Sequence, residues 1–140
     1  MAQLELQKTG NGYSVATVGN LSAFGGKAFV KDAIGTTSME ASFGSLAAGE
    51  ALPFFHHHKQ NEELYIILSG NGVFSLDGNN EEVSSGSIVK VSPKVSRGIK
   101  NTGNDALVYI CIQARENSLE QYTMTDGVIE EPKSVIKPYM

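Results

Sequence analysis

Short apolar runs of strand length alternate along this chain with clusters of glycine, asparagine, aspartate and serine. Such clusters are typical of turns between β-strands, and few stretches have the apolar spacing of a long helix. The pattern therefore predicts an all-β fold with seven strands: Tyr13–Val18, Thr37–Leu46, Glu63–Leu68, Gly72–Leu76, Ser87–Val91, Gly98–Asn101 and Ala106–Gln113.

The connections between the strands are also marked. Ser69-Gly70-Asn71-Gly72 and Asp77-Gly78-Asn79-Asn80 are each expected to form a hairpin turn, because their residues tolerate positive φ angles. The region up to residue 35 is ambiguous, with a loop expected at 21–26. Near the other end, 117–122 fits one helical turn, and the tail 132–140, with two prolines, is expected to be extended.

Two of the predicted strands are apolar on both faces, namely those at 63–68 and 106–112. A strand in a sandwich or barrel has this pattern when its outer face is also covered. A second subunit would provide such a cover, and we expect a homodimer. The alternative is that the terminal segments of the same chain cover the outer face.

Composition narrows the class of protein. The chain has 140 residues, of which 41% are hydrophobic and 19% charged, as in a folded globular protein. The net charge of -4 disfavours a surface that binds nucleic acid or an anionic membrane, and no apolar run is long enough to cross a bilayer. The N-terminus lacks signal-peptide features, and a single cysteine cannot form an internal disulfide. We therefore expect a reduced, cytoplasmic protein.

The candidate chemistry is concentrated in one stretch, which contains all three histidines. In an extended segment His56 and His58 share a face while His57 points away, and Glu63 opens the next predicted strand. Two imidazoles and one carboxylate suit a divalent transition metal such as Zn, Fe, Mn or Ni. The alternative is a polar hairpin whose histidines are solvated or hydrogen-bonded.

The spacing of these residues resembles the first motif of the small single-domain cupins. Gly49 precedes His56 by a spacer one residue longer than usual, and the motif continues through Glu63 to a closing glycine at Gly70. A second cupin motif can be laid over 86–101, where Asn101 falls in the expected place. The resemblance implies one cupin domain over 1–140, folded as a double-stranded β-helix (jelly-roll barrel). It also implies His56, His58 and Glu63 as metal ligands, and favours Glu63 over Glu62.

Position 97 departs from the second motif, because Arg97 stands where cupins usually carry a histidine as the fourth metal ligand. A guanidinium has five N–H donors and no acceptor, so it cannot coordinate a cation. We expect Arg97 to clamp a carboxylate or phosphate of an anionic ligand. The alternatives are a surface arginine, or one that is ion-paired with Glu63 in a site that no longer holds metal.

Further ligand contacts are expected on the faces that these residues share. Tyr65 follows Glu63 by two positions, and Tyr109 and Gln113 share one face of a late strand with Cys111. We predict that Tyr65, Tyr109 and Gln113 contact the substrate. Ordinary core packing is the alternative for both tyrosines and our expectation for Cys111.

The resulting hypothesis is a cupin that binds a divalent metal and a small, anionic organic molecule in its barrel. The family resemblance implies dioxygenase- or isomerase-type chemistry if the protein is an enzyme. The alternative is a non-catalytic cupin that binds a sugar or metabolite, with a structural metal or none. A storage or scaffold role is a third, weaker hypothesis.

Overall fold

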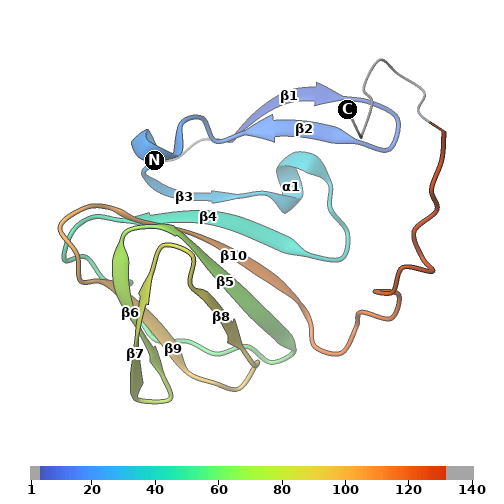
Figure 1. Cartoon of the computed structure of the whole chain (residues 1–140). Coiled ribbons are helices and arrows are strands. Elements are labelled where there is room, and N and C mark those ends of the chain that lie inside the picture. The colour runs from blue at the N-terminus through green and yellow to red at the C-terminus, as the bar shows by residue number, and fades with distance from the viewer. Residues whose placement is uncertain (1–3, 132–140) are drawn as a thin grey trace.

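The computed structural model describes residues 4–131, and almost all of their regular structure is β-strand. A five-stranded sheet has the order β3-β4-β10-β5-β8, a three-stranded sheet has the order β7-β6-β9, and β1 and β2 form a separate hairpin (Figure 1). The strands are β1 Glu5–Thr9, β2 Ser14–Thr17, β3 Gly26–Phe29, β4 Glu40–Leu46, β5 Asn61–Ser69, β6 Asn71–Leu76, β7 Asn79–Ser84, β8 Ile88–Val91, β9 Arg97–Asn101 and β10 Leu107–Arg115. Two short helical elements, η1 Leu21–Ala23 and α1 Lys31–Ile34, lie before β4.

The two larger sheets enclose the core. Along β5, buried side chains alternate with half-buried ones, as a period of two requires when one face of the strand packs inward. The inward side chains of both sheets meet in one hydrophobic cluster: Leu46, Tyr65, Ile67, Phe74, Val83, Val91, Ile99, Leu107, Tyr109 and Cys111. The barrel interior is therefore packed with side chains, most of which are apolar.

An irregular segment, 51–58, runs antiparallel to β9 and widens the three-stranded sheet. The amide of Leu52 donates to the carbonyl of Ile99, at 3.1 Å. Farther along, His56 and Arg97 exchange two backbone hydrogen bonds of 3.1 and 2.9 Å. Directly paired residues on antiparallel strands have their side chains on the same face, so this pairing brings the side chains of His56 and Arg97 together.

All seven predicted strands are present, with ends that differ by up to three residues. The predictions missed β1, β3, β7 and the short helix α1. β1 and β7 are short and mostly exposed, so they lack the alternation of buried positions that marks a half-buried strand.

The first predicted hairpin turn is wrong. β5 pairs with β10 and β8, whereas β6 pairs with β7 and β9, so Ser69-Gly70-Asn71 is a corner at which the chain leaves one sheet for the other. Gly70 has φ of 92°, and a methyl group there would meet the carbonyl oxygen of Ala106. Only glycine fits such a corner.

The second predicted turn is shorter than expected. It consists of Asp77 and Gly78, whose φ angles of 50° and 84° are typical of a tight hairpin, and Asn79 and Asn80 already belong to β7. In the predicted loop at 21–26, Leu21–Ala23 forms a 3-10 turn and Gly26 begins β3.

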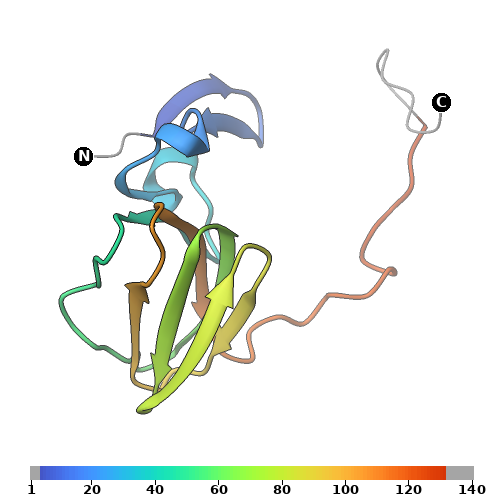
Figure 2. The ribbon, with the colours of Figure 1, turned by 60° about the vertical axis from the view of Figure 1, so that its left-hand side comes forward.

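No helical turn forms at 117–122. Asn117 takes a left-handed conformation with φ of 62°, which ends the turn after β10, and the chain then has no regular structure apart from a turn at 123–126. The described tail leads away from the barrel (Figure 2), and its large apolar side chains, Leu119, Tyr122, Met124, Val128 and Ile129, are exposed. The prediction for 132–140 lies outside the described residues.

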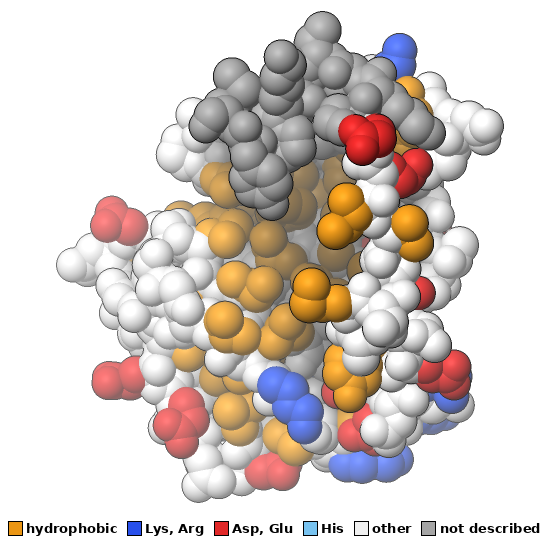
Figure 3. Space-filling model, turned by 45° about the vertical axis from the view of Figure 1, so that its right-hand side comes forward, with side chains coloured by type: hydrophobic (Ala, Val, Ile, Leu, Met, Phe, Trp, Pro, Cys, Tyr) orange, Lys and Arg blue, Asp and Glu red, His pale blue; other side chains and the backbone are white. Residues whose placement is uncertain are grey.

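The outer face of the five-stranded sheet is apolar, as the two-sided strands predicted. Phe43, Ile110, Ile66 and Ile88 pair in register and form one row across four strands. The first three are half-buried and Ile88 is 67% exposed. Hydrophobic side chains also gather in a band in the space-filling view (Figure 3).

Candidate metal centre

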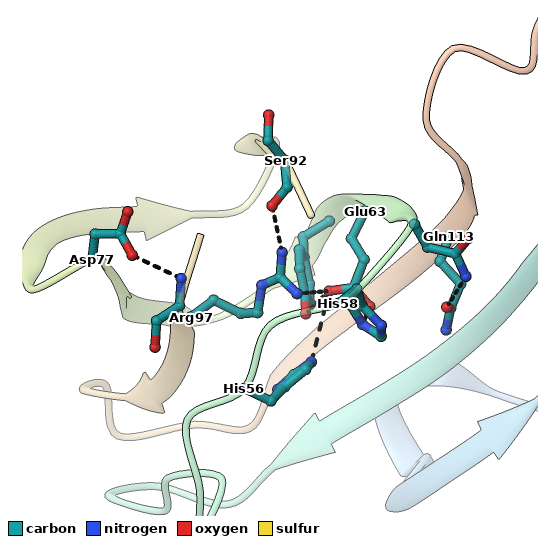
Figure 4. A network of polar contacts seen from close by, with 10 residues as sticks. His56, His58, Glu63, Asp77, Ser92, Arg97 and Gln113 are labelled. Carbon is teal, nitrogen blue, oxygen red and sulfur yellow. Dashed lines mark hydrogen bonds and ion pairs between the residues drawn. The ribbon is translucent and has the colours of Figure 1, made fainter. Parts of the chain in front are cut away.

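The segment 51–58 and the start of β5 bring His56, His58 and Glu63 together (Figure 4). One ligand atom from each residue lies within 4.8 Å of the others. His57 is exposed, as the alternation predicted, and Glu62 faces away from the cluster on the opposite side of β5 from Glu63. The structure therefore assembles the three residues that the sequence selected, and their role as ligands stays a prediction.

Glu63 is the centre of the polar network, although only 4% of its side chain is exposed. Its Oε1 accepts a 2.7 Å hydrogen bond from the hydroxyl of Tyr65, and its Oε2 lies 3.1 Å from Nε2 of His58. Burial pushes the pKa of Glu63 upward. The Tyr65 hydrogen bond and the electrostatic effects of His58 and Arg97 outweigh it, so the pKa lies below its ordinary value. Glu63 is therefore an anion at neutral pH.

Arg97 is buried against this carboxylate rather than lying on the surface, so the surface alternative is wrong. Only 1% of its side chain is exposed, and Nη1 lies 3.5 Å from Oε1 of Glu63. Nη2 donates to the carbonyl oxygen of Ser92, at 2.9 Å. Nε and Nη1 are buried and have no hydrogen-bond partner among the described residues. The ion pair with Glu63 is thus present, and two nitrogen atoms of the guanidinium keep N–H groups without an acceptor.

His56 is suited to metal ligation by its charge state. Burial lowers its pKa, and the nearby Arg97 adds to the effect, while Glu63 partly opposes it. A neutral imidazole has a free lone pair for a cation. Its Nε2 lies 3.9 Å from Oε1 of Glu63, and its ring meets that of His58 edge to face at 5.2 Å between centroids.

The predicted ligand contacts on β10 lie on the inward face. Gln113 pairs with Glu63 across the sheet, and its Oε1 accepts a 2.9 Å hydrogen bond from Nδ2 of Asn61. Tyr109 and Cys111 are buried in the core cluster, and burial raises the pKa of each to about 12. Cys111 therefore stays a thiol, as expected for a core residue.

A family model described as a cupin domain matches residues 42–113, which is 72 of the 140 residues. The chain belongs to the cupin family. A solved cupin protein from Bacteroides fragilis is 36% identical, with a TM-score of 0.75, and the alignment covers 90% of this chain and 98% of that one. The expected cupin double-stranded β-helix is therefore confirmed.

Curated relatives match a shorter stretch of this cupin. An uncharacterised protein from Methanocaldococcus jannaschii is 39% identical over 56 residues, which is 40% of this chain and 45% of that protein. An oxalate-binding protein from Thermotoga maritima is 33% identical over 57 residues, which is 41% of this chain and 47% of that protein. The matches thus span about half the length of these relatives. Within residues 4–131, no helix is long and apolar enough to cross a membrane.

The donor atoms fit a transition metal. Ligand atoms about 2.1 Å from one ion lie about 3.0 to 3.4 Å apart in octahedral or tetrahedral geometry. Nε2 of His58 and Oε2 of Glu63 already have that separation, at 3.1 Å, whereas Nε2 of His56 lies 3.9 Å from the other oxygen, Oε1. The three ligand atoms as a set lie within 4.8 Å, so the side chains would have to move closer together around an ion. About a quarter to a third of each histidine is exposed, so the open side of the cupin site lies at the imidazoles.

Two participants were missed by the sequence analysis. Asn61 precedes Glu63 by two residues and so shares its face, a signal that the period of two contained. The carbonyl of Ser92 holds Arg97, and a backbone acceptor leaves no mark in the residue pattern.

Proposed function

We propose that this cupin binds a divalent transition metal through His56, His58 and Glu63, together with a small anionic organic ligand. The observation that carries the proposal is the convergence of two imidazole nitrogens and one carboxylate oxygen within 4.8 Å. Zn, Fe, Mn and Ni all accept this set of ligands. Such a set leaves coordination positions for water or a ligand.

Each residue of the site would have a distinct role. His56 and His58 would hold the metal from the open side, and Tyr65 fixes the orientation of the Glu63 carboxylate. When bound, the metal would supply Lewis-acid or oxygen-activating chemistry. Arg97 would make the site favourable for negative charge. We propose that Gln113 contacts the ligand at the rim, beside Asn61.

Two observations support an anionic ligand. Arg97 brings into the site a permanent charge and two nitrogen atoms whose N–H groups have no acceptor among the described residues. Independently, the relative from Thermotoga maritima carries the name of an oxalate-binding protein. A small carboxylate is therefore the ligand class that we propose to test first.

The test is elemental analysis of protein purified without an affinity tag, followed by titration with each metal. We expect about one Zn, Fe, Mn or Ni per chain, lost in His58→Ala. His57→Ala is the matched control, because His57 is exposed and outside the cluster, and it should retain the metal. A folded protein that binds none of these metals would contradict the proposal.

A non-catalytic cupin that binds its ligand without a metal is the second candidate, and the Glu63–Arg97 ion pair favours it. In this pair Arg97 neutralises the charge of the buried Glu63 carboxylate, so no cation from solution is needed. In that case the folded, metal-free protein binds a small carboxylate, and Arg97→Gln removes the binding. Binding that requires added metal would exclude this candidate.

We also propose that the chain forms a homodimer through the outer face of the five-stranded sheet. The row from Phe43 to Ile88 is only half-buried in its centre and exposed at the edge strand β8. The N-terminal segment reaches one end of the row, where the rings of Phe24 and Phe43 lie 6.1 Å apart, whereas the large apolar side chains of the C-terminal tail are themselves exposed. A second copy presents the same row and would bury both.

Light scattering during size-exclusion chromatography tests this arrangement. Ile66→Lys should convert the dimer to a monomer, because it would place a charge in the centre of the apolar row. Lys100→Glu, on an exposed position of β9, is the control and should leave the dimer intact. A wild-type protein that is monomeric at high micromolar concentration would refute the interface.

A further inference from the structure

We propose that the metal and a small carboxylate anion bind to this site cooperatively, each raising the affinity for the other, and that Arg97 causes much of the coupling. The inference rests on the proposed metal centre and adds that the affinities for metal and anion depend on each other. It follows from the charges that surround Glu63.

Glu63 is the carboxylate of the cluster with His56 and His58, and Nη1 of the buried Arg97 lies 3.5 Å from its Oε1. The ion pair with Arg97 already balances the charge of Glu63. A divalent cation bound by the same carboxylate would therefore leave at least two positive charges uncompensated in a half-buried site. Arg97 thus lowers the affinity of the empty site for a metal ion. An anion that binds with the metal compensates the excess positive charge.

The hydrogen-bond inventory of Arg97 leads to the same conclusion. Nη2 has the Ser92 carbonyl as its acceptor, whereas Nε and Nη1 have no acceptor among the described residues. Only 1% of the side chain is exposed, so water does not replace the missing acceptors. A metal that draws the oxygens of Glu63 toward itself would leave this buried cation with still less compensation. A buried charge without partners is strongly unfavourable, so a second anion beside the metal would be stabilised by the charge that the metal leaves unmatched.

Arginine also differs from the usual histidine in the number of coordination positions that it leaves open on a bound metal. A histidine at position 97 would donate a lone pair and complete a four-residue centre, but a guanidinium has no lone pair to give. Coordination positions beyond His56, His58 and Glu63 must therefore be filled from solution. A carboxylate can fill one and bring the missing negative charge, which a neutral water molecule does not.

The wild-type experiment measures Mn²⁺ affinity with and without oxalate, using the full tag-free chain. Free Mn²⁺ is read by electron paramagnetic resonance, and protein-free titrations correct for Mn²⁺–oxalate complexes. We expect oxalate to tighten Mn²⁺ binding at least tenfold. Because coupling between two ligands is reciprocal, Mn²⁺ must tighten oxalate binding by the same factor, measured by calorimetry. A factor within twofold of one would overturn the inference while leaving the metal centre intact.

Variants then test the role of Arg97. Arg97→Gln should tighten Mn²⁺ binding without oxalate at least threefold and reduce the coupling factor at least threefold. Lys94→Gln removes an exposed charge from the neighbouring loop and should change both values less than twofold. Arg97→Lys keeps the charge and should keep the coupling. A coupling factor that is equal in wild type and Arg97→Gln would refute the role of Arg97. Absence of Mn²⁺ binding under every condition would instead refute the proposed metal centre.

Discussion

The hydrogen bond from Tyr65 to Glu63 provides a direct test of the site's electrostatics. Tyr65→Phe removes only the hydroxyl, which lies 2.7 Å from Oε1 of a carboxylate that is almost fully buried. A hydrogen bond to a charged group contributes about 1.5 to 3 kcal/mol, so we expect a loss of about 2 kcal/mol in the free energy of unfolding at pH 7. With an unfolding entropy of about 2.1 cal/mol/K per residue, this loss lowers Tm by about 7 °C for a chain of this size.

The loss must depend on pH, and its sign follows from the pKa of Glu63. That pKa is depressed in the folded protein, so the ionised carboxylate stabilises the fold above its unfolded pKa, and this contribution is lost as the pH falls through the folded pKa. Tyr65 is the strongest of the groups that lower the pKa. The loss of unfolding free energy in Tyr65→Phe should therefore be largest at neutral pH. It should be about 1 kcal/mol smaller at a pH low enough to protonate Glu63.

Thermal and urea denaturation, followed by circular dichroism at several pH values, measure both effects. Tyr13→Phe is the control, because Tyr13 is 57% exposed and loses an equivalent hydroxyl. It should change the free energy of unfolding by less than about 0.5 kcal/mol. A loss in Tyr65→Phe as small as in this control, or one that does not change with pH, would refute the assignment of Tyr65 as the partner that keeps Glu63 ionised.

Four further substitutions test the surrounding packing, each by urea denaturation at pH 7. Glu63→Gln should lower the free energy of unfolding by about 3 to 5 kcal/mol, because it leaves the buried guanidinium with only the Ser92 carbonyl as a partner. This loss should exceed that of Arg97→Met, which removes the buried cation itself. The opposite order would contradict this argument. Asn101→Ala should cost about 3 kcal/mol, because its amide makes three hydrogen bonds, to the Leu46 and Asp105 carbonyls and from the Gly103 amide. A cost below about 1 kcal/mol would refute that role. Gly44→Ala should cost about 2 kcal/mol, because the added methyl would lie 2.5 Å from Cζ of Tyr109; an unchanged stability would show that the ring has room to move.

The parts of the fold that the sequence predicted are those that a local pattern specifies. β5 and β10 contain continuous apolar runs of strand length, at 64–68 and 106–112, which mark them in the sequence as buried strands. The Gly70 corner was misinterpreted because a turn motif does not reveal which strands pair. Gly70 meets the backbone of Ala106, which is distant in the chain, so a contact of high sequence separation decides its conformation.

The candidate site divides in the same way. His56, His58 and Glu63 lie within eight positions of one another, so alternation and spacing were enough to select them. The family spacing also placed Asn101, whose buried amide holds the backbone at the end of β9. By contrast, the orientation of Arg97 depends on the approach of the two sheets. Neither its burial nor the Ser92 carbonyl that holds it follows from the residues around position 97.

Arg97 also shows why replacing a metal ligand changes more than the number of ligands. A histidine-to-arginine change exchanges a neutral donor for a permanent cation, and here that cation is buried 3.5 Å from the one carboxylate of the metal cluster. The same side chain neutralises Glu63 in the empty site, and it would repel a cation that bound to the same carboxylate. Both effects shrink when an additional anion is present. In the proposed function, the charge of the ligand is therefore the property that an arginine at position 97 constrains most strongly.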